Sequence, residues 1–286
     1  MDLPNLKKKR ISILGCGWLG FPLAKRILDK DISTLVKGST TSFDKIEKLK
    51  ESGIESYLIN LNPSYELDSE SITNFLDSDL LIIAIPPGIR RNPENFHISQ
   101  INKLLPYIKQ SPLQEIIYIS STSVYPDLNR IVTEKDVTAP GDAASKELVA
   151  TENTITESVL DANVTIVRFG GLLGYDRIPG KYVKGKKDLT TQETPVNYIH
   201  RDDAIEALIA IISGEAPNQT FNIVAPIHSK RGEVYTKTCL EFNWPPPTYL
   251  VTEKLENYKI VSPQKFQSWY NFKFIYPDPL HFYYKL

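Results

Sequence analysis

The chain has 286 residues, of which 41% are hydrophobic and 23% are charged. This length and composition are typical of a soluble globular protein with a sizeable core. A formal net charge of -1 gives no indication of nucleic-acid binding or of attraction to an anionic membrane surface. With only two cysteines, Cys16 and Cys239, we expect neither a disulfide framework nor a metal site. We also find no apolar segment long enough to span a bilayer, so a cytoplasmic, reduced protein is expected.

Strand and helix patterns alternate along most of the chain, as in parallel sheets built from right-handed crossovers. Short apolar runs predict strands over residues 11–14, 33–37, 55–60, 79–85, 115–121, 164–169 and 221–224. Apolar residues at helical spacing predict helices over residues 18–30, 43–52, 71–75, 95–108, 145–160 and 202–213. The sequence therefore predicts an α/β protein of the doubly wound Rossmann type, with a mainly parallel seven-stranded sheet.

The last sixty or so residues differ in composition, because they are rich in proline and aromatic residues. We expect them to form a small C-terminal substrate lobe over the carboxyl ends of the strands, where open α/β sheets bind ligands. The predicted division assigns residues 1–169 and 197–225 to the Rossmann domain. Residues 170–196 and 226–286 are assigned to the substrate lobe.

Three glycines, Gly15, Gly17 and Gly20, follow the first predicted strand at the spacing G-x-G-x-x-G and open the first predicted helix. In this context the first glycine permits a tight turn and the third allows close packing of helix and strand. The second lets the backbone approach a pyrophosphate, which the helix N-terminus attracts. We therefore predict a dinucleotide site at the turn, formed by Gly15, Cys16, Gly17, Trp18, Leu19 and Gly20.

The end of the second predicted strand indicates which dinucleotide is bound. NAD-binding proteins carry an acidic residue there that accepts hydrogen bonds from the adenine ribose. Here no carboxylate lies between Asp31 and Asp44. The segment instead offers one cation and several hydroxyls, which suit a 2′-phosphate, so NADP is preferred and NAD remains the alternative. The residues expected to bind this phosphate are Lys37, Ser39, Thr40 and Thr41.

Several segments resemble the extended and atypical short-chain dehydrogenase/reductases, the NAD(P)-dependent epimerase/dehydratase group. Besides the glycine turn, residues 120–125 (SSTSVY) resemble the SS-x-x-VYG strand end, and residues 197–204 (NYIHRDDA) resemble the family's IHvdD segment. Residues 168–174 (RFGGLLG) and 221–223 (FNI) also resemble family motifs. From this resemblance and from their places at strand ends, further cofactor contacts are expected at Ile85, Pro86, Pro87, Ser120, Lys146, Phe169, Gly170 and Gly171.

The resemblance implies catalysis by a serine, a tyrosine and a lysine, the last two spaced as Y-x-x-x-K. Ser121 matches the serine and Lys146 matches the lysine, but Asp142 stands where the tyrosine is expected. The predicted triad is therefore incomplete. Asp142 either replaces the tyrosine as a base or caps the following helix with Lys146 as its partner, and we favour the cap.

Four residues are expected to contact the substrate: Thr122, Arg177, Lys181 and His200. Arg177 and Lys181 could hold a phosphate or a carboxylate, although a solvated surface explains such cations equally well. His200 could line the pocket, but we favour a role at the start of the following helix, with Asp202 or Asp203 as the cap. A structural ion pair is the expected role of Arg168.

These features predict an NAD(P)-binding oxidoreductase or epimerase/dehydratase-like enzyme that acts on a small polar substrate, with a nucleotide sugar as one option. The absent tyrosine leaves an alternative open, a non-catalytic NADP-binding redox sensor or regulatory protein. The expected partners are a small-molecule substrate and, as an option, a second copy of the chain in a homodimer. Nucleic acid and membrane partners are not expected.

Overall fold

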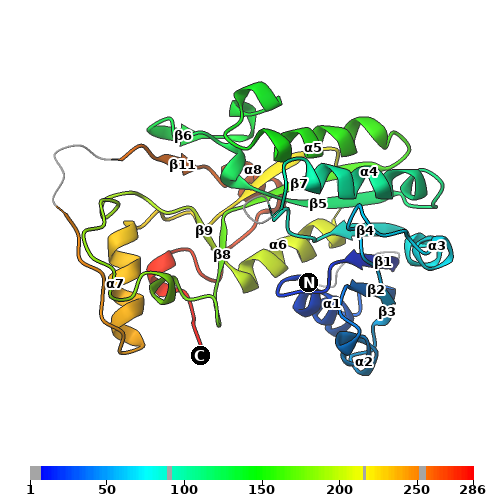
Figure 1. Ribbon diagram of the computed structural model, residues 1–286, viewed down its shortest axis with the longest axis horizontal. Helices are drawn as coiled ribbons and strands as arrows, with labels where there is room; N and C mark the ends of the chain where they lie inside the picture. Colours follow the sequence, from blue (N-terminus) through cyan, green and yellow to red (C-terminus); the bar gives the residue numbers. More distant parts are fainter. Residues whose placement is uncertain (1–7, 89–91, 215–216, 251–255) are drawn as a thin grey trace.

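A single parallel sheet organises the computed structural model, which describes residues 8–88, 92–214, 217–250 and 256–286 (Figure 1). Its strands are β1 (Lys9–Leu14), β2 (Ser33–Thr40), β3 (Glu55–Leu58), β4 (Leu80–Ile83), β5 (Glu115–Ser121), β7 (Asn163–Phe169) and β10 (Thr220–Ile223). They lie in the order β10-β7-β5-β4-β1-β2-β3, and every neighbouring pair is parallel. The predicted doubly wound α/β fold is therefore confirmed. The strand order reverses between β1 and β4, which places a ligand crevice at their carboxyl ends.

Helices cover both faces of the sheet. The helices are α1 (Gly20–Asp29), α2 (Asp44–Glu51), α3 (Ser69–Leu76), α4 (Phe96–Ile108), α5 (Lys146–Ser158), α6 (Arg201–Ser213), α7 (Arg231–Glu241) and α8 (Gln264–Tyr270). One core cluster joins the sheet to α3, α4 and α5, and a second joins it to α1, α2, α6 and α8. In Figure 1, α4 and α5 lie above the sheet, and α1 and α6 lie below it. None of the described helices is both long and apolar enough to cross a bilayer.

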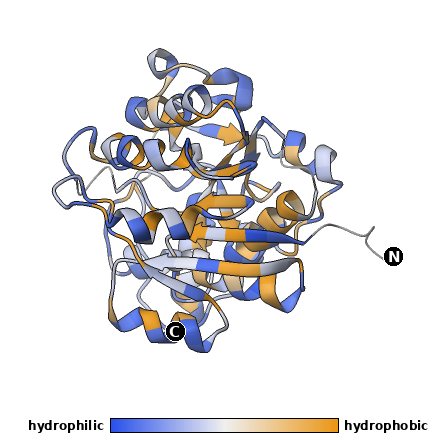
Figure 2. Ribbon diagram, turned by 90° about the vertical axis from the view of Figure 1, so that its right-hand side faces the viewer, coloured by the Kyte–Doolittle hydropathy of each residue, from blue (hydrophilic) through white to orange (hydrophobic). Residues whose placement is uncertain are grey.

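The pattern of apolar residues explains these elements. All four residues of β4 are fully buried, as expected for a strand that is covered on both faces. On α1, Leu23, Ala24 and Ile27 are buried at helical spacing, so one face of the helix packs on the sheet. Figure 2 shows the same arrangement, with hydrophobic residues concentrated in the strands and hydrophilic residues on the outer faces of the helices.

The segments beyond the main sheet contain elements that the sequence analysis did not predict, namely α7, α8 and two small pairs of parallel strands. These pairs are β8 (Gly171–Leu173) with β9 (Tyr198–His200), and β6 (Arg130–Val132) with β11 (Lys259–Val261). A separate small cluster of buried side chains holds the region around α7 together, formed by Leu173, Ile178, Ala225, Phe282 and Tyr284. In Figure 1 this region extends to the side of the sheet, next to the carboxyl ends of its strands.

A buried ion pair links α5 to β7 beneath the carboxyl end of the sheet. Arg168 Nη2 lies 2.6 Å from Glu152 Oε2, and both side chains are only 4% exposed. The guanidinium also donates to the Val137 carbonyl at 3.1 Å, and the Ser120 hydroxyl donates to Glu152. The expected structural role of Arg168 is thereby confirmed, and its charge is fully compensated.

We predict that Arg168→Met lowers the free energy of unfolding by about 3 to 5 kcal/mol, because it leaves Glu152 buried without its partner. The matched control is Arg130→Met, which removes an exposed pair with Asp136 and should cost less than about 1 kcal/mol. Urea unfolding followed by circular dichroism measures both. Equal losses in the two variants would show that the buried pair has no special role.

Candidate functional site

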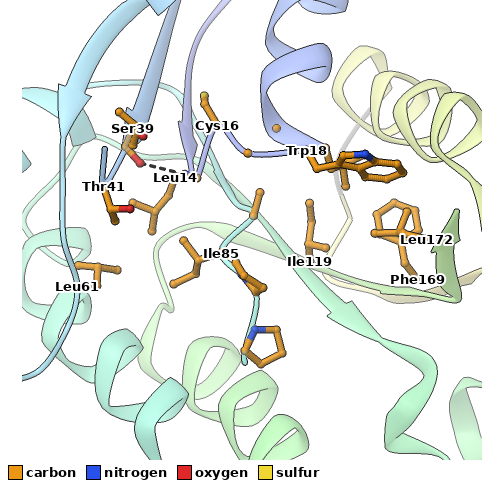
Figure 3. Close-up of a pocket in the computed structure, with 18 of the residues that line it drawn as sticks. Leu14, Cys16, Trp18, Ser39, Thr41, Leu61, Ile85, Ile119, Phe169 and Leu172 are labelled. Carbon is orange, nitrogen blue, oxygen red and sulfur yellow. Dashed lines mark hydrogen bonds between the residues drawn. The ribbon is translucent and has the colours of Figure 1, made fainter. Parts of the chain in front are cut away.

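A cleft of about 540 Å³ opens at the carboxyl ends of β1, β2, β4, β5 and β7, at the predicted switch point. The glycine turn, the end of β2 and the segment after β7 form its walls. Figure 3 shows Ser39, Thr41 and Leu61 on one side of the cleft, and Trp18, Phe169 and Leu172 on the other. No Asp or Glu lies among the described residues that line it. The cleft therefore suits a ligand that carries negative charge.

The three glycines of the turn have different surroundings. A Cβ atom on Gly20 would lie 2.3 Å from the Gly15 carbonyl oxygen, and one on Gly15 would lie 3.1 Å from the Ile85 side chain. Gly15 also has a φ of +100°, which disfavours any other residue there. A Cβ on Gly17, in contrast, would meet no atom within 4 Å. Gly15 and Gly20 are therefore needed for packing, whereas Gly17 leaves backbone open to the cleft, as pyrophosphate binding requires.

Hydrogen bonds to Ser39 hold the turn against the end of β2. The N–H of Gly15 donates to the Ser39 hydroxyl at 2.9 Å, and the N–H of Cys16 donates to the Ser39 carbonyl at 2.7 Å. The Cys16 side chain is buried under the turn, and burial raises the pKa of its thiol to about 12. Cys16 is thus an unreactive packing residue. Helix α1 begins at Gly20. The N–H groups of Phe21 and Leu23 already donate to the carbonyls of Gly17 and Leu19, and Pro22 has no N–H, so the groups that remain for a ligand are those of residues 18–20.

Most of the residues predicted to bind a cofactor line this one cleft. They are Gly15, Cys16, Gly17, Trp18, Leu19, Gly20, Ser39, Thr40, Thr41, Ile85, Pro86, Pro87, Ser120, Phe169, Gly170 and Gly171. Segments that are separated by more than 100 residues in the chain therefore meet at a single surface. Two of the predicted cofactor residues, Lys37 and Lys146, do not line it.

The expectation for Lys37 needs correction. Strand β2 continues to Thr40, three residues beyond its predicted end, so Lys37 lies inside the strand and not at its end. Its side chain is 5% exposed, and its ammonium donates to the carbonyl oxygens of Asn74 and Asp77 at the end of α3. A cation is well placed there, because a helix C-terminus carries partial negative charge. Lys37 is thus held away from the cleft.

Next to the end of β2, the cation that lines the cleft is Lys45. It lies in the first turns of α2, close after the hydroxyl-bearing end of β2, and its side chain is exposed. Lys45 could have been identified from the sequence, because it lies only four residues after Thr41. It was missed because the second strand was predicted to end at residue 37. Further lining residues that the sequence analysis did not identify are Leu14, Ile59, Asn60, Leu61, Ala84, Gln100, Ile119 and Leu172.

The residues proposed for catalysis do not come together. Ser121 lines the cleft, but Asp142 and Lys146 are exposed residues outside its lining. Asp142 ends a short 3₁₀ turn (Pro140–Asp142), and α5 begins only at Lys146 with Ser145 at the N-cap position. The two residues are therefore not one turn apart on a helix. Asp142 is neither the cap of α5 nor a group that faces the cleft.

Of the four residues predicted to contact substrate, only Arg177 lines the cleft. Thr122 is buried at the start of a 3₁₀ turn, and Lys181 is exposed elsewhere. His200 is fully buried and caps α6, because its Nδ1 accepts a hydrogen bond from the Asp202 N–H at 3.2 Å. Burial lowers the pKa of this imidazole. The favoured role of His200 at the helix start is confirmed, although the histidine itself is the cap.

Comparison with known proteins shows relatives along nearly the whole chain and several proteins of the same fold. No protein-family model matches it. Protein YeeZ of Escherichia coli is 30% identical over 272 residues, which cover 95% of this chain and 98% of that protein. An epimerase family protein of Staphylococcus saprophyticus is 26% identical over 291 residues, covering 92% and 94%. The UDP-glucose-4-epimerase of Stenotrophomonas maltophila, solved with NAD and formylated UDP-arabinopyranose, has a TM-score of 0.77 at 12% identity, covering 96% and 95%. That likeness shows a shared fold.

We predict that Gly17→Val abolishes dinucleotide binding without unfolding the protein. The added side chain has space in the fold, but it would occupy the surface on which a pyrophosphate must lie. Gly141→Val is the matched control, because a Cβ there also meets no atom within 4 Å and lies outside the cleft. NADPH and NADH titrations followed by nicotinamide fluorescence measure binding, and circular dichroism measures folding. Unchanged binding in Gly17→Val would mean that the pyrophosphate lies elsewhere.

Proposed function

The chain belongs to the family of protein YeeZ of Escherichia coli, and on that premise we propose that it is an NADP-dependent oxidoreductase or epimerase/dehydratase-like enzyme. Its substrate would be a small polar molecule, with a nucleotide sugar as the leading candidate. The observation that carries this proposal is the open backbone at Gly17, next to two tightly packed glycines at the switch point of the sheet. An enzyme of the same fold, the epimerase of Stenotrophomonas maltophila, holds NAD and a UDP-sugar.

The cleft offers suitable groups along the length of a dinucleotide. The N–H groups of residues 18–20, at the start of α1, would bind the pyrophosphate. Leu14, Ile59, Leu61 and Ile85 form an apolar surface suited to a flat adenine ring, and Asn60 and Gln100 supply polar groups beside it. When bound, the cofactor would supply hydride transfer at the opposite end, near Phe169 and Ser121.

The preference for NADP rests on the end of β2 and the start of α2. Ser39, Thr40, Thr41 and Lys45 line the cleft there, without any carboxylate that would repel a 2′-phosphate. Lys45 takes the role that the sequence analysis gave to Lys37. No other cation among the described lining residues lies at this end, because Arg177 belongs to the segment after β7.

Ser121 is the candidate for contact with the reacting group. Its Oγ accepts a hydrogen bond from the Ser123 N–H at 3.1 Å, which leaves the hydroxyl proton free to donate to a substrate oxygen. The neighbouring Ser120 hydroxyl is instead committed to Glu152. No tyrosine lies among the described lining residues, which supports the expectation that the usual triad is incomplete. This keeps a redox sensor as the second candidate function.

The predicted division into a cofactor domain and a substrate lobe agrees with the proposed enzyme function. We propose that residues 1–169 and 197–225 bind the cofactor, and that residues 170–196 and 226–286 form the substrate lobe. The separate buried cluster around Ile178 and Phe282 supports such a division.

We predict that Lys45→Gln raises the dissociation constant of NADPH by about 10-fold or more, because a charge-assisted contact to the 2′-phosphate is lost. The dissociation constant of NADH should stay within about twofold of the wild-type value, since NADH lacks that phosphate. Lys50→Gln is the matched control, because Lys50 lies on the same helix, pairs with Glu47 and does not line the cleft. Isothermal titration calorimetry measures all of these constants. A loss of NADH binding equal to that of NADPH would contradict the role of Lys45.

A second experiment separates the enzyme from the sensor. The protein is incubated with NADP⁺ or NAD⁺ and a panel of UDP-sugars, and products are resolved by anion-exchange chromatography. We expect turnover of at least one sugar, and Ser121→Ala should lower it by about 100-fold or more because a hydrogen-bond donor to the substrate is lost. Ser123→Ala is the control, because Ser123 contacts Ser121 through its backbone and lies outside the cleft lining. NADPH binding with no turnover of any sugar would favour the sensor.

A further inference from the structure

Arg177 enters the cleft from a short loop that follows β8. Its guanidinium carbon lies 3.9 Å from the centroid of the Trp18 ring, which belongs to the glycine turn. The Trp18 indole N–H in turn donates to Asp176 Oδ1 at 2.7 Å. Two contacts therefore join the glycine turn to the loop, and they hold the Arg177 guanidinium over the indole at the wall of the cleft.

The guanidinium of Arg177 has no hydrogen bond or ion pair to any described residue, although the side chain is half-buried. Asp176 is the nearest acid in the chain, but the indole of Trp18 occupies one of its oxygens. Burial lowers the pKa of Arg177, and the attraction of the neighbouring Asp176 carboxylate offsets only part of this effect, because the net shift is downward. Other arginines near the sheet are paired, such as Arg168 with Glu152 and Arg26 with Glu206.

A second cation, Arg201, lies close to Arg177, and the repulsion between the two is unfavourable when no anion is bound. The guanidinium carbon of Arg201 lies 4.8 Å from the centroid of the same Trp18 ring and 3.7 Å from that of Tyr175. The Nε of Arg201 is buried and has no hydrogen-bond partner. Two positive charges thus share one indole, and their repulsion also lowers the pKa of Arg177. An anionic ligand would relieve both the repulsion and the lost solvation.

The loop is held in place before any ligand arrives. Gly174 and Arg177 form a backbone bridge, and Tyr175 adopts a left-handed φ of +52°. The Tyr175 N–H donates to the Tyr283 carbonyl at 3.1 Å, and the Lys285 N–H donates to the Tyr175 carbonyl at 3.2 Å. The C-terminal segment therefore fixes the loop that carries Arg177. Such a preorganised arginine would bind an anion with little loss of side-chain entropy.

We propose that Arg177, stacked on Trp18, binds an anionic group of the substrate, a phosphate or a carboxylate, within the cofactor cleft. This inference rests on the proposed function and narrows the substrate to acidic small molecules. The guanidinium offers a planar pair of N–H donors that matches the oxygens of either group. Arg177 lies over the Trp18 ring, and Figure 3 shows Trp18 and Leu172 on the side of the cleft opposite Ser39 and Thr41. It is therefore distinct from the proposed 2′-phosphate contact.

The test uses inorganic pyrophosphate as the probe and protein that is saturated with NADH, so that the cofactor already fills its own diphosphate site. We expect calorimetry to detect pyrophosphate binding, and Arg177→Gln should weaken it by about 10-fold or more. Arg177→Lys should give an intermediate loss, because it keeps the charge but not the planar donor pair. Arg130→Gln is the matched control and should change pyrophosphate affinity by less than about threefold, because Arg130 is an exposed arginine outside the cleft lining.

Three results would overturn the proposal: no pyrophosphate binding to the NADH-saturated wild type, equal binding in Arg177→Gln, or a comparable loss of NADH affinity in that variant. The last result would assign Arg177 to the diphosphate of the cofactor. If the wild type binds neither NADH nor NADPH, the proposed function fails, and the same titrations on the cofactor-free protein still decide whether Arg177 binds an anion. Circular dichroism confirms that each variant is folded.

Discussion

The close contact between Gly15 and Gly20 is the constraint on which the rest of the site depends. Because no side chain fits between these residues, β1 passes directly into α1, and the first turn of the helix points into the switch point of the sheet. The hydrogen bonds from Gly15 and Cys16 to Ser39 then fix the end of β2 beside the same turn. Glycine packing thus fixes both the turn that we propose for a pyrophosphate and the position of the groups that we propose distinguish NADP from NAD.

The charged groups that line the cleft are positive. The described lining contains two cations, Lys45 and Arg177, and no carboxylate. The N-terminus of α1 adds partial positive charge. The acidic groups nearby are engaged elsewhere, Glu152 with Arg168 and Asp176 with Trp18. The cleft is consequently suited to a ligand pair with several negative charges, as a phosphorylated dinucleotide and an acidic substrate would be.

The sequence predicted the fold well because apolar runs and helical spacing are local signals, and the seven strands of the main sheet were all found. It was less successful where tertiary packing decides the outcome. Lys37 was misplaced because β2 continues for three more residues, and strand alternation then buries the side chain against α3. Asp142 was misplaced because it ends a separate 3₁₀ turn and Ser145 takes the N-cap position of α5, and Lys146, the first residue of that helix, is exposed outside the cleft. The stacking of Arg177 and Arg201 on Trp18 joins residues more than 150 positions apart, which no local pattern reveals.

The central claim is that the glycine turn at the β1–α1 junction holds the pyrophosphate of NADP, with the 2′-phosphate next to Lys45. A crystal structure of the protein with bound NADPH tests it most directly. We expect diphosphate oxygens within hydrogen-bond distance of backbone N–H groups in residues 18–20, because the N–H of Gly17 donates to the Gly15 carbonyl. We expect the 2′-phosphate within reach of Lys45 and the hydroxyls that end β2. A dinucleotide bound outside this cleft, or one whose 2′-phosphate lies away from Lys45, would contradict it.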